Sequence, residues 1–316
     1  MSSASRPRIR LVLYVADVIS RPDPSAEHLR AWSPGIPGMS EVLHARFVEH
    51  AYPLHAHGDW SLLLIDQGEV HYELDGRRHR APAGTVTLLP PRVPHDGHAA
   101  STREGFRKRV AYLDRGWLPE QLVSAASARP LFDDPALIAA TGRLHALVAL
   151  PGEGFRAESE LAGIGARLRE LLVERESGRM RTRLSAVDGG YGDASGGAGP
   201  GRTADAPLAL RLRELLEDAV AQNTEAAAAH LTLAAASRLL GASPEHLIRV
   251  FRAQYGVPPH RYLTSIRVDR ARRLLLGGMR AVDAATAAGF YDQAHLTRHF
   301  RRVLGTTPTA FQRSAA

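Results

Sequence analysis

The stretch LIRVFRAQYGVPPHRY (residues 247–262) is matched by LTRHFRRVLGTTPTAF (residues 296–311) at a constant offset of 49 residues. The matched positions carry the same or a similar residue type in both copies: Leu247 and Leu296, Arg249 and Arg298, Phe251 and Phe300, Arg252 and Arg301, Gly256 and Gly305, Pro259 and Pro308, and Tyr262 and Phe311. This many matches in one register exceed what chance produces. The chain therefore contains an internal repeat, and both copies are expected to adopt the same fold.

Each copy has the pattern of a short helix, a tight turn and a second helix. In the first copy, LAAASRLL (233–240) predicts the short helix and GAS (241–243) predicts the turn. Ser243 then caps the second helix, which has Pro244 in its first turn. In the second copy, Asp292 is the expected cap. Both copies are therefore predicted to be helix-turn-helix units.

A long helix is predicted between the two units, over PPHRYLTSIRVDRARRLLLGG (258–278). We expect three of its side chains to be buried: Tyr262, Ile266 and Leu274. In the flanking units, apolar residues four positions apart are expected to face the core, namely Leu247 with Phe251 and Leu296 with Phe300. A rigid helix between the units would place their second helices in successive major grooves of DNA.

The second helix of such a unit reads base edges with outward residues near its N-terminus. Arginine can bind a guanine edge with two hydrogen bonds and glutamine an adenine edge, and each good pair discriminates by ~1–3 kcal/mol. Repetition across the two copies favours Arg249 and Arg298 most. The full set of candidate DNA-binding residues is Glu245, His246, Arg249, Arg252, Gln293, Ala294, His295, Arg298, Arg301 and Arg302.

Charge is distributed unevenly along the chain. Residues 231–316 hold thirteen arginines, no lysine and four acidic residues, a net charge of +9, whereas the whole chain of 316 residues carries +7. A basic C-terminal third suggests a polyanionic partner, although charge alone would also fit a solvated basic face. There is no cysteine, which excludes disulfides and a thiolate nucleophile.

The sequence indicates a cytoplasmic protein without a membrane span. No apolar run reaches the ~18 residues that a spanning helix needs. RIRLVLYVADVIS (8–20) is interrupted by Asp17 and precedes no cleavage site of the small-residue type. We therefore expect it to be an irregular extension or an edge strand rather than a secretory signal.

Composition divides the chain into parts. The stretch SAVDGGYGDASGGAGPGRTADA (185–206) holds seven glycines between Gly189 and Gly201, which is typical of a flexible linker. We predict an N-terminal extension at 1–38, a ligand-sensing domain with a helical tail at 39–184, the linker at 185–206, and a DNA-binding domain at 207–316.

The first of these domains begins with β signals. VHYEL (70–74) alternates apolar and polar residues, and the Asp-Gly pair at 75–76 predicts a hairpin turn. A turn at PAG (82–84), the strand-like TVTLL (85–89) and the loop PPRVPHDG (90–97) follow, as in a small barrel or sandwich.

Helical signals come next. Asp133 or Asp134 is the expected cap of a helix that has Pro135 in its first turn. A second helical stretch at 156–176 carries an apolar stripe of Leu161, Ile164, Leu168 and Leu171 or Leu172. This stripe fits a seam between subunits and packing on its own domain equally well.

The segment from about 208 to 313 resembles the DNA-binding domain of the AraC/XylS transcription regulators. The resemblance rests on GASPEHLIRVFRAQYGVPPHRYL, IRVDRARRLLL and AAGFYDQAHLTRHFRRVLGTTPTAF, and it covers about a third of the chain. It implies two helix-turn-helix units on a linker helix, acting at promoters and often activating. One departure is Ala284, where the family usually carries isoleucine; with Val282 nearby, it predicts a lighter core in the second unit.

The N-terminal part resembles the cupin-like sensor domain of many such regulators. The matching features are HAH at 55–57, a turn at Gly68, DG at 75–76, PAG at 82–84 and PPRVPH ending at His95. Metal-binding cupins add a glutamate soon after the first histidine pair, but Gly58, Asp59, Trp60 and Ser61 stand here. The three histidines His55, His57 and His95 therefore form a candidate divalent-metal site without its carboxylate, a ligand pocket, or part of a core. As ligand-binding residues we expect His55, His57, Trp60, Tyr72 and His95.

Together these features predict an α+β chain of two domains: an N-terminal cupin-like β-barrel with trailing helices, and a C-terminal all-α domain with two helix-turn-helix units. The expected function is transcription regulation responsive to a small-molecule effector, with no enzymatic activity and no required cofactor. Expected partners are double-stranded promoter DNA, the effector, RNA polymerase and a second copy of the chain. Two alternatives stay open: a cupin-type metalloenzyme fused to a DNA-binding module, and an N-terminal domain that serves only for dimerisation.

Overall fold

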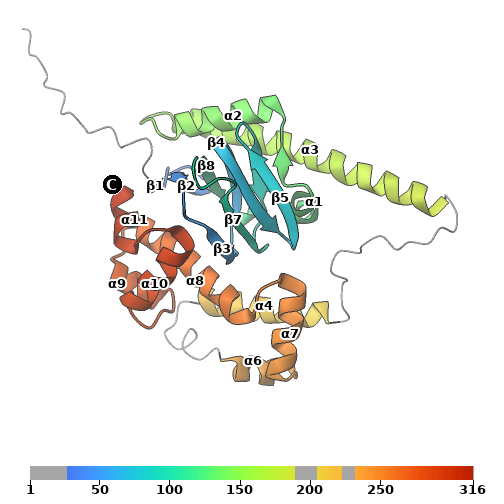
Figure 1. Cartoon of the computed structure of the whole chain (residues 1–316), viewed down its shortest axis with the longest axis vertical. Helices are drawn as coiled ribbons and strands as arrows, with labels where there is room; N and C mark the ends of the chain where they lie inside the picture. Colours follow the sequence, from blue (N-terminus) through green and yellow to red (C-terminus); the bar gives the residue numbers. More distant parts are fainter. Residues whose placement is uncertain (1–26, 189–204, 223–231, 316) are drawn as a thin grey trace, which may run out of the picture.

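A computed structural model describes residues 27–188, 205–222 and 232–315 of the chain. The N-terminal part is a nine-stranded β structure covered by helices, and the C-terminal part is all helical, as the sequence predicts (Figure 1). The stretch 8–20 and most of the predicted linker lie outside the described residues.

The strands form a barrel-like sheet in the order β1-β2-β8-β4-β6-β9, with β3 paired to β7 and both β5 and β7 paired to β4. Their bounds are β1 (His28–Trp32), β2 (Met39–Phe47), β3 (Tyr52–His55), β4 (Trp60–Leu74), β5 (Arg77–Pro82), β6 (Val86–Leu89), β7 (His95–Ala99), β8 (Phe106–Leu113) and β9 (Leu131–Phe132). The predicted hairpin turn is confirmed, because Asp75 and Gly76 join β4 to β5 with positive φ angles. Because β1 pairs with β2, the sheet already begins inside the extension predicted at 1–38.

Strand β4 is bent where a turn was expected. Gly68 does not end the strand but lies within it, with φ of +74°. A Cβ atom there would lie 2.2 Å from the Gly105 carbonyl oxygen, so only glycine permits this close approach. The bend lets one strand pair with β8 and β6 in its first half and with β5 and β7 in its second half.

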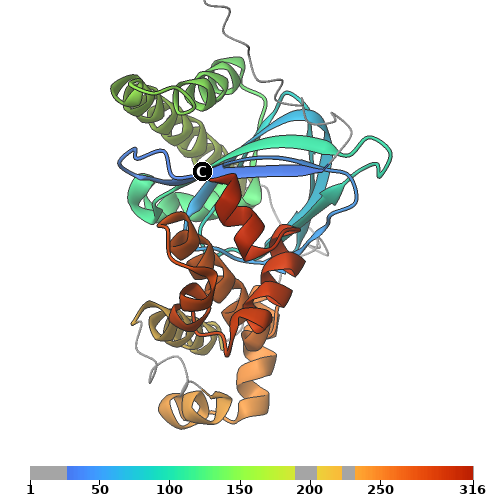
Figure 2. The ribbon, with the colours of Figure 1, turned by 90° about the vertical axis from the view of Figure 1, so that its left-hand side faces the viewer.

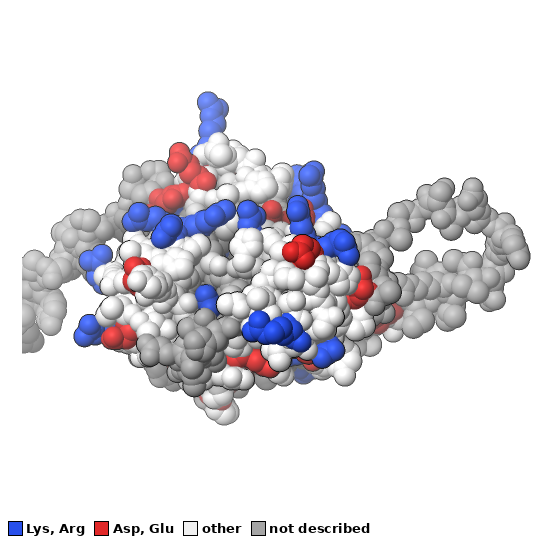
Figure 3. Space-filling model, turned by 90° about the horizontal axis from the view of Figure 1, so that it is seen from below, with Lys and Arg blue, Asp and Glu red and all other residues white. Residues whose placement is uncertain are grey.

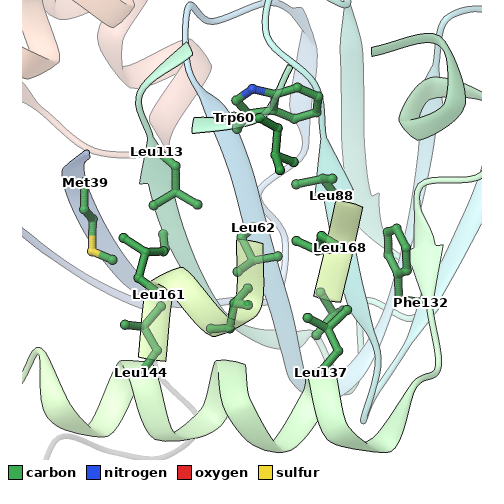
Figure 4. Close-up of a cluster of buried hydrophobic side chains, with 14 of the residues drawn as sticks. Met39, Trp60, Leu62, Leu88, Leu113, Phe132, Leu137, Leu144, Leu161 and Leu168 are labelled. Carbon is green, nitrogen blue, oxygen red and sulfur yellow. The ribbon is translucent and has the colours of Figure 1, made fainter. Parts of the chain in front are cut away.

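Helices α2 (Pro135–Leu147) and α3 (Gly154–Asp188) cover one face of the sheet. Asp134 caps α2 by accepting a hydrogen bond from the Leu137 backbone N–H at 2.8 Å. The α3 stripe packs into its own domain and is not a seam between subunits, because its leucines lie in one cluster with the outer residues of β4 (Figure 4). The residues of this cluster drawn and labelled in the figure are Met39, Trp60, Leu62, Leu88, Leu113, Phe132, Leu137, Leu144, Leu161 and Leu168. Short helices η1 (Arg115–Trp117), η2 (Glu120–Leu122) and α1 (Val123–Ala128) connect β8 to β9.

The C-terminal helices confirm the repeat. Their bounds are α4 (Ala206–Ala221), α6 (Leu233–Leu240), α7 (Pro244–Tyr255), α8 (Pro259–Leu276), α9 (Ala281–Ala287), α10 (Gln293–Leu304) and α11 (Pro308–Ser314). Helices α7 and α10 begin and end at positions 49 residues apart, and Ser243 and Asp292 cap them as predicted. Four expected core residues, Leu247, Phe251, Leu296 and Phe300, are fully buried.

Two details of the C-terminal core differ from the prediction. On α8, Tyr262 and Ile266 are buried as predicted, but Leu274 is only half-buried and its neighbour Leu275 is buried instead. In the second unit Ala284 is fully buried while Val282 is 41% exposed, so Val282 adds little to that core. Ala284, Ala285 and Ala288 lie in one apolar cluster with residues of α8, α10 and α11.

The helical part packs directly on the barrel. Val268 and Leu275 of α8 share one apolar cluster with Phe47, Phe106 and Tyr112 of β2 and β8. Figure 2 shows α11 against the barrel and α6 far from it, and α10 contacts β3. Two hydrogen bonds fix this side: His50 Nε2 donates to the Val303 carbonyl at 3.2 Å, and the Ala31 backbone N–H donates to Ser314 Oγ at 3.2 Å. The second unit therefore contacts β1 and β3 directly, whereas α6 and α7 of the first unit pack mainly on α4 and α8, with Leu54 and Ala56 of the barrel in the same apolar cluster.

Candidate functional site

The three histidines singled out in the sequence come together inside the barrel. The ring centroids of His55 and His95 are 4.5 Å apart, and those of His57 and His95 are 4.7 Å apart. His55 lies at the end of β3 opposite His95 at the start of β7, and His57 follows two residues after His55. Burial lowers the pKa of both His55 and His57 to about 3, and that of His95 falls as well. All three imidazoles are therefore neutral at pH 7.

Hydrogen bonds fix the tautomer of each ring. The Nδ1 atoms of His55, His57 and His95 lie 2.8–2.9 Å from the carbonyl oxygens of Pro53, Asp59 and Val93, respectively. A carbonyl oxygen only accepts, so each Nδ1 carries the proton and each Nε2 is left as an acceptor. His57 Nε2 accepts from Ser61 Oγ at 3.1 Å. The Nε2 atoms of His55 and His95 accept no hydrogen bond from the described residues.

These histidines line a cavity of about 590 Å³ of empty space, part of it open to solvent. Its apolar wall consists of Leu63, Ile65, Val70, Ala81, Leu89, Phe106 and Val110, and Tyr52, Tyr72 and Tyr112 add aromatic rings. Tyr72 is thus at the cavity, as predicted.

Trp60 does not belong to the cavity, which corrects the prediction. Side chains alternate along a strand, so Ser61 and Leu63 face the cavity and Trp60 faces the opposite side. Trp60 is fully buried against the α2–α3 layer, and its Nε1 donates to the Arg115 carbonyl at 3.1 Å.

Lys108 is a cavity residue that the sequence reasoning missed. Along β8, Phe106, Lys108, Val110 and Tyr112 face the cavity, so a lysine stands on an otherwise apolar and aromatic face. Lys108 is 8% exposed, and its Nζ lies 4.1 Å from the centroid of the Tyr52 ring. Burial, with a smaller contribution from Arg272, lowers the pKa of Lys108 to about 7. The signal for it in the sequence was the alternation in FRKRVAYL (106–113), which places Lys108 on the same face as Phe106, Val110 and Tyr112.

The three histidines do not fit a metal ion. Among the residues described, no group of three or more His, Cys, Asp or Glu side chains is arranged to hold one. The Nε2 atom of His57 already accepts a hydrogen bond from Ser61. Asp59, the acid nearest in sequence, accepts a hydrogen bond from Ser40 at 2.8 Å and pairs with Arg273 at 3.7 Å. Its carboxylate is therefore engaged between the two domains.

A buried network of charges joins α8 to the barrel beside the cavity. Arg272 Nε lies 2.8 Å from Glu41 of β2, and its guanidinium stacks on the Tyr112 ring at 4.0 Å. Asp269 pairs with Arg272 at 3.1 Å and accepts from the Gly58 backbone N–H at 3.3 Å. Burial raises the pKa of Glu41 to about 7, and Arg272 opposes the rise. Arg272 and the half-exposed Arg273 thus serve the contact between domains.

The two reading helices present their basic residues to solvent. Glu245, Arg249 and Arg252 of α7 are exposed, as are Gln293, Arg298, Arg301 and Arg302 of α10. The half-buried His246 accepts from Arg249 Nη2 at 2.6 Å, and so orients that arginine. His295, also half-buried, stands edge-on to Phe290 at 5.3 Å.

Tyr291 is a residue at this surface that the sequence reasoning missed. It is 91% exposed and immediately precedes the cap of α10. The signal for it in the sequence was an aromatic residue that falls outside the spacing of the buried apolar residues. Figure 3 shows basic side chains in several groups over the face seen from below, with acidic side chains between them. Among the described residues no helix is long and apolar enough to cross a membrane.

Comparison with known proteins agrees with the two-domain architecture. The family model of the AraC-like ligand binding domain matches residues 37–166, and a helix-turn-helix domain model matches residues 236–314. The chain belongs to the AraC family of transcription regulators. This AraC-family chain therefore combines a ligand-binding N-terminal domain with a DNA-binding C-terminal domain, as predicted.

Relatives along most of the AraC-family chain are transcription regulators. The uncharacterized HTH-type transcriptional regulator YbfI of Bacillus subtilis is 26% identical over 81% of this chain and 85% of its own. The arabinose operon regulatory protein of Escherichia coli is 24% identical over 88% of this chain and 92% of its own. The solved structure of ToxT from Vibrio cholerae shares the two-domain fold, with a TM-score of 0.51 at 11% identity over 92% of this chain and 98% of that one.

Proposed function

We propose that this chain reads an asymmetric promoter site with α7 and α10 and changes its DNA binding when a small ligand fills the barrel cavity. The observation that carries the proposal is the equivalence of two capped, arginine-bearing helices at either end of α8, which itself closes on the barrel. Because the two heads differ in sequence, the expected site is a direct arrangement of two different halves.

The exposed side chains of the two helices are the proposed base and phosphate contacts. Arg249 and Arg298 hold equivalent positions and would read guanine edges, with Gln293 reading an adenine. Helix N-termini and the remaining arginines would meet phosphates and set the register. In this arrangement His246 positions Arg249, and His295 holds the start of α10 against Phe290. The complete proposed set is Glu245, His246, Arg249, Arg252, Gln293, His295, Arg298, Arg301 and Arg302.

The proposed signal passes through Tyr112. This ring lines the cavity, and the Arg272 guanidinium of α8 stacks on it at 4.0 Å. A ligand that touches Tyr112 therefore changes the packing of α8, the helix that spaces the two reading heads. For the response to occur, the ligand must bind one arrangement of α8 more tightly than another.

Selection of binding sites from a random duplex pool, followed by affinity measurements at several salt concentrations, tests the DNA contacts. Arg298→Ala should weaken binding to the selected site and relax one position of it, by ~1–3 kcal/mol. Arg78→Ala is the control with the same charge change, because Arg78 is exposed on β5, away from both heads. Unchanged affinity and unchanged base preference in Arg298→Ala would reject the assignment of α10.

Further partners are part of the proposal. A promoter-bound regulator in the cytoplasm meets RNA polymerase, which we propose as a protein partner. Self-association is supported by three exposed apolar side chains in and around the α2–α3 layer, namely Leu150, Phe155 and Val173. Sedimentation of the full chain measures the proposed homodimer.

The proposed role is regulatory rather than enzymatic. The relatives are transcription regulators, and the cavity histidines have neither the carboxylate of a metal-binding cupin nor a second free nitrogen on His57. Ligand-dependent DNA affinity without turnover would support this role. Turnover that depends on bound metal would support the fused-metalloenzyme alternative instead.

A further inference from the structure

Four polar groups on one wall of the cavity have no partner among the described residues. The Lys108 ammonium contacts only aromatic rings, with no carboxylate paired to it. The Tyr52 hydroxyl is buried and unbonded. The Nε2 atoms of His55 and His95 are free acceptors. Buried polar groups are normally satisfied, so this wall is prepared for a molecule that bonds to them.

The donor or acceptor character of these four groups indicates which functional groups the bound molecule has. An ammonium only donates and favours an anion, and the neighbouring Tyr52 hydroxyl can donate to the same oxygen atoms. The two free Nε2 atoms only accept, because their protons are fixed on Nδ1, so they repel a carboxylate and favour a hydroxyl. Most of the remaining wall is apolar, and Ser61, Tyr72, Thr87, Asp96 and Tyr112 add further polar groups to it.

The geometry points to a small hydroxy acid as the ligand: its carboxylate on Lys108 and Tyr52, its hydroxyl on His55 or His95, and its hydrocarbon part against Leu63 and Val110. This inference rests on the proposed ligand-responsive function and names the ligand class of that same cavity.

The spacing of the groups suits a short molecule. Lys108 Nζ lies 4.1 Å from the Tyr52 ring centroid, and the His55 ring centroid lies 6.0 Å from that same point. The ammonium and the His55 ring are therefore at most about 10 Å apart. A saturated chain of a few carbons can join two such points.

A matched set of ligands tests the inference on the full-length protein. Calorimetry compares omega-hydroxybutyrate and omega-hydroxyhexanoate with the acid and the alcohol of the same chain length. The hydroxy acid of one length should bind at least about tenfold more tightly than both of its partners, because each partner leaves one polar end of the cavity unsatisfied.

Variants assign the two ends. Lys108→Met should abolish the preference for the hydroxy acid over the alcohol and keep the preference over the plain acid. His95→Phe should do the reverse. Arg107→Met is the matched control, because Arg107 is the exposed neighbour of Lys108 on the outer face of β8, and it should change neither preference.

The ligand set on the unaltered protein decides the matter even where a variant fails to fold. Equal binding of hydroxy acid and alcohol, or no saturable binding of either hydroxy acid at millimolar concentration, would overturn the inference. The DNA affinity of Arg298→Ala is compared separately with that of the unaltered protein. If the ligands fail but Arg298→Ala still weakens DNA binding, only the ligand class is wrong. If Arg298→Ala binds DNA as the unaltered protein does, the proposed DNA-reading function has failed.

Discussion

Lys108 is a buried lysine without a paired carboxylate among the described residues. It is an amine among aromatic rings and neutral imidazoles, with Arg272 of α8 as the only nearby charge that shifts its pKa. Burial without a counterion favours the uncharged form, which is why its pKa falls from 10.5 to about 7. The Tyr52 and Phe106 rings are the contacts of this amine among the described residues, and we propose that its further partner is a ligand.

Replacing Lys108 by methionine should stabilise the ligand-free protein, and the gain should depend on pH. In the folded state the amine loses its proton near pH 7, whereas in the unfolded chain it keeps the proton to about pH 10.5. The unfolded state thus binds more protons between these values, so the stability of the unaltered protein rises with pH in that window. The advantage of Lys108→Met should therefore be largest at pH 7 and shrink toward pH 10, as measured by urea unfolding. An advantage that is constant with pH would contradict the lowered pKa.

Single residues were the least predictable part of the site from sequence. The three histidines could be recognised because two of them share one extended segment and the third closes a recognisable loop. Trp60 was assigned to the wrong face, because it was chosen for its aromatic ring close to His57 in sequence, whereas alternation along β4 turns Ser61 and Leu63 toward the cavity and Trp60 away from it. Lys108 was missed because its significance lies in the absence of an acid around it, which is a tertiary property.

Helices α7 and α10 are alike in sequence and differ in their support. Both are capped by a side chain that accepts a backbone N–H, and both end at a glycine with positive φ. However, α10 lies against β3 and α11 against β1, whereas α7 packs on α4, α6 and α8. The repeat predicted where each helix begins, because its capping and apolar spacing are local signals. The unequal docking was not predictable, since it depends on contacts with residues more than two hundred positions away.

The cap of α10 offers a test at the scale of one helix. Asp292→Ala removes the acceptor for the His295 backbone N–H, now at 2.6 Å, and should lower the free energy of unfolding by about 0.5–2 kcal/mol. Asp292→Asn keeps an acceptor at the same place and should cost much less. Equal losses in both variants would show that the carboxylate charge, rather than the cap, stabilises the helix. Denaturant unfolding of the full chain measures both.

At the scale of the whole molecule, α8 contacts both the helix-turn-helix units and the barrel. It spaces the reading helices, and it also closes on the barrel through Asp269, Arg272 and Arg273. In the sequence these arginines counted only toward the basic charge of the C-terminal third, because the acids that pair with Arg272 and Arg273 from the barrel stand far away in the chain. The charge count of the C-terminal third therefore overstates the number of cations available to DNA.

Removing Arg272 should loosen the whole interface. Arg272→Met leaves Glu41 buried without its cation, and breaking a buried ion pair costs about 3–5 kcal/mol. Hydrogen exchange should rise in β2 and α8 together. Arg261→Met, on the exposed side of the same helix, is the control. The added change Glu41→Gln should restore part of the loss, and a loss below about 0.5 kcal/mol in Arg272→Met would show that the pair does not hold the domains.

Because the Tyr112 ring is shared between the cavity and α8, occupying the cavity and signalling from it are separable events. A compound short enough to bind Lys108 and the histidines without reaching Tyr112 would compete with the natural ligand and leave α8 where it is. Chemically, such a compound is an antagonist. The same cavity therefore offers a way to silence the regulator with a molecule smaller than the one that operates it.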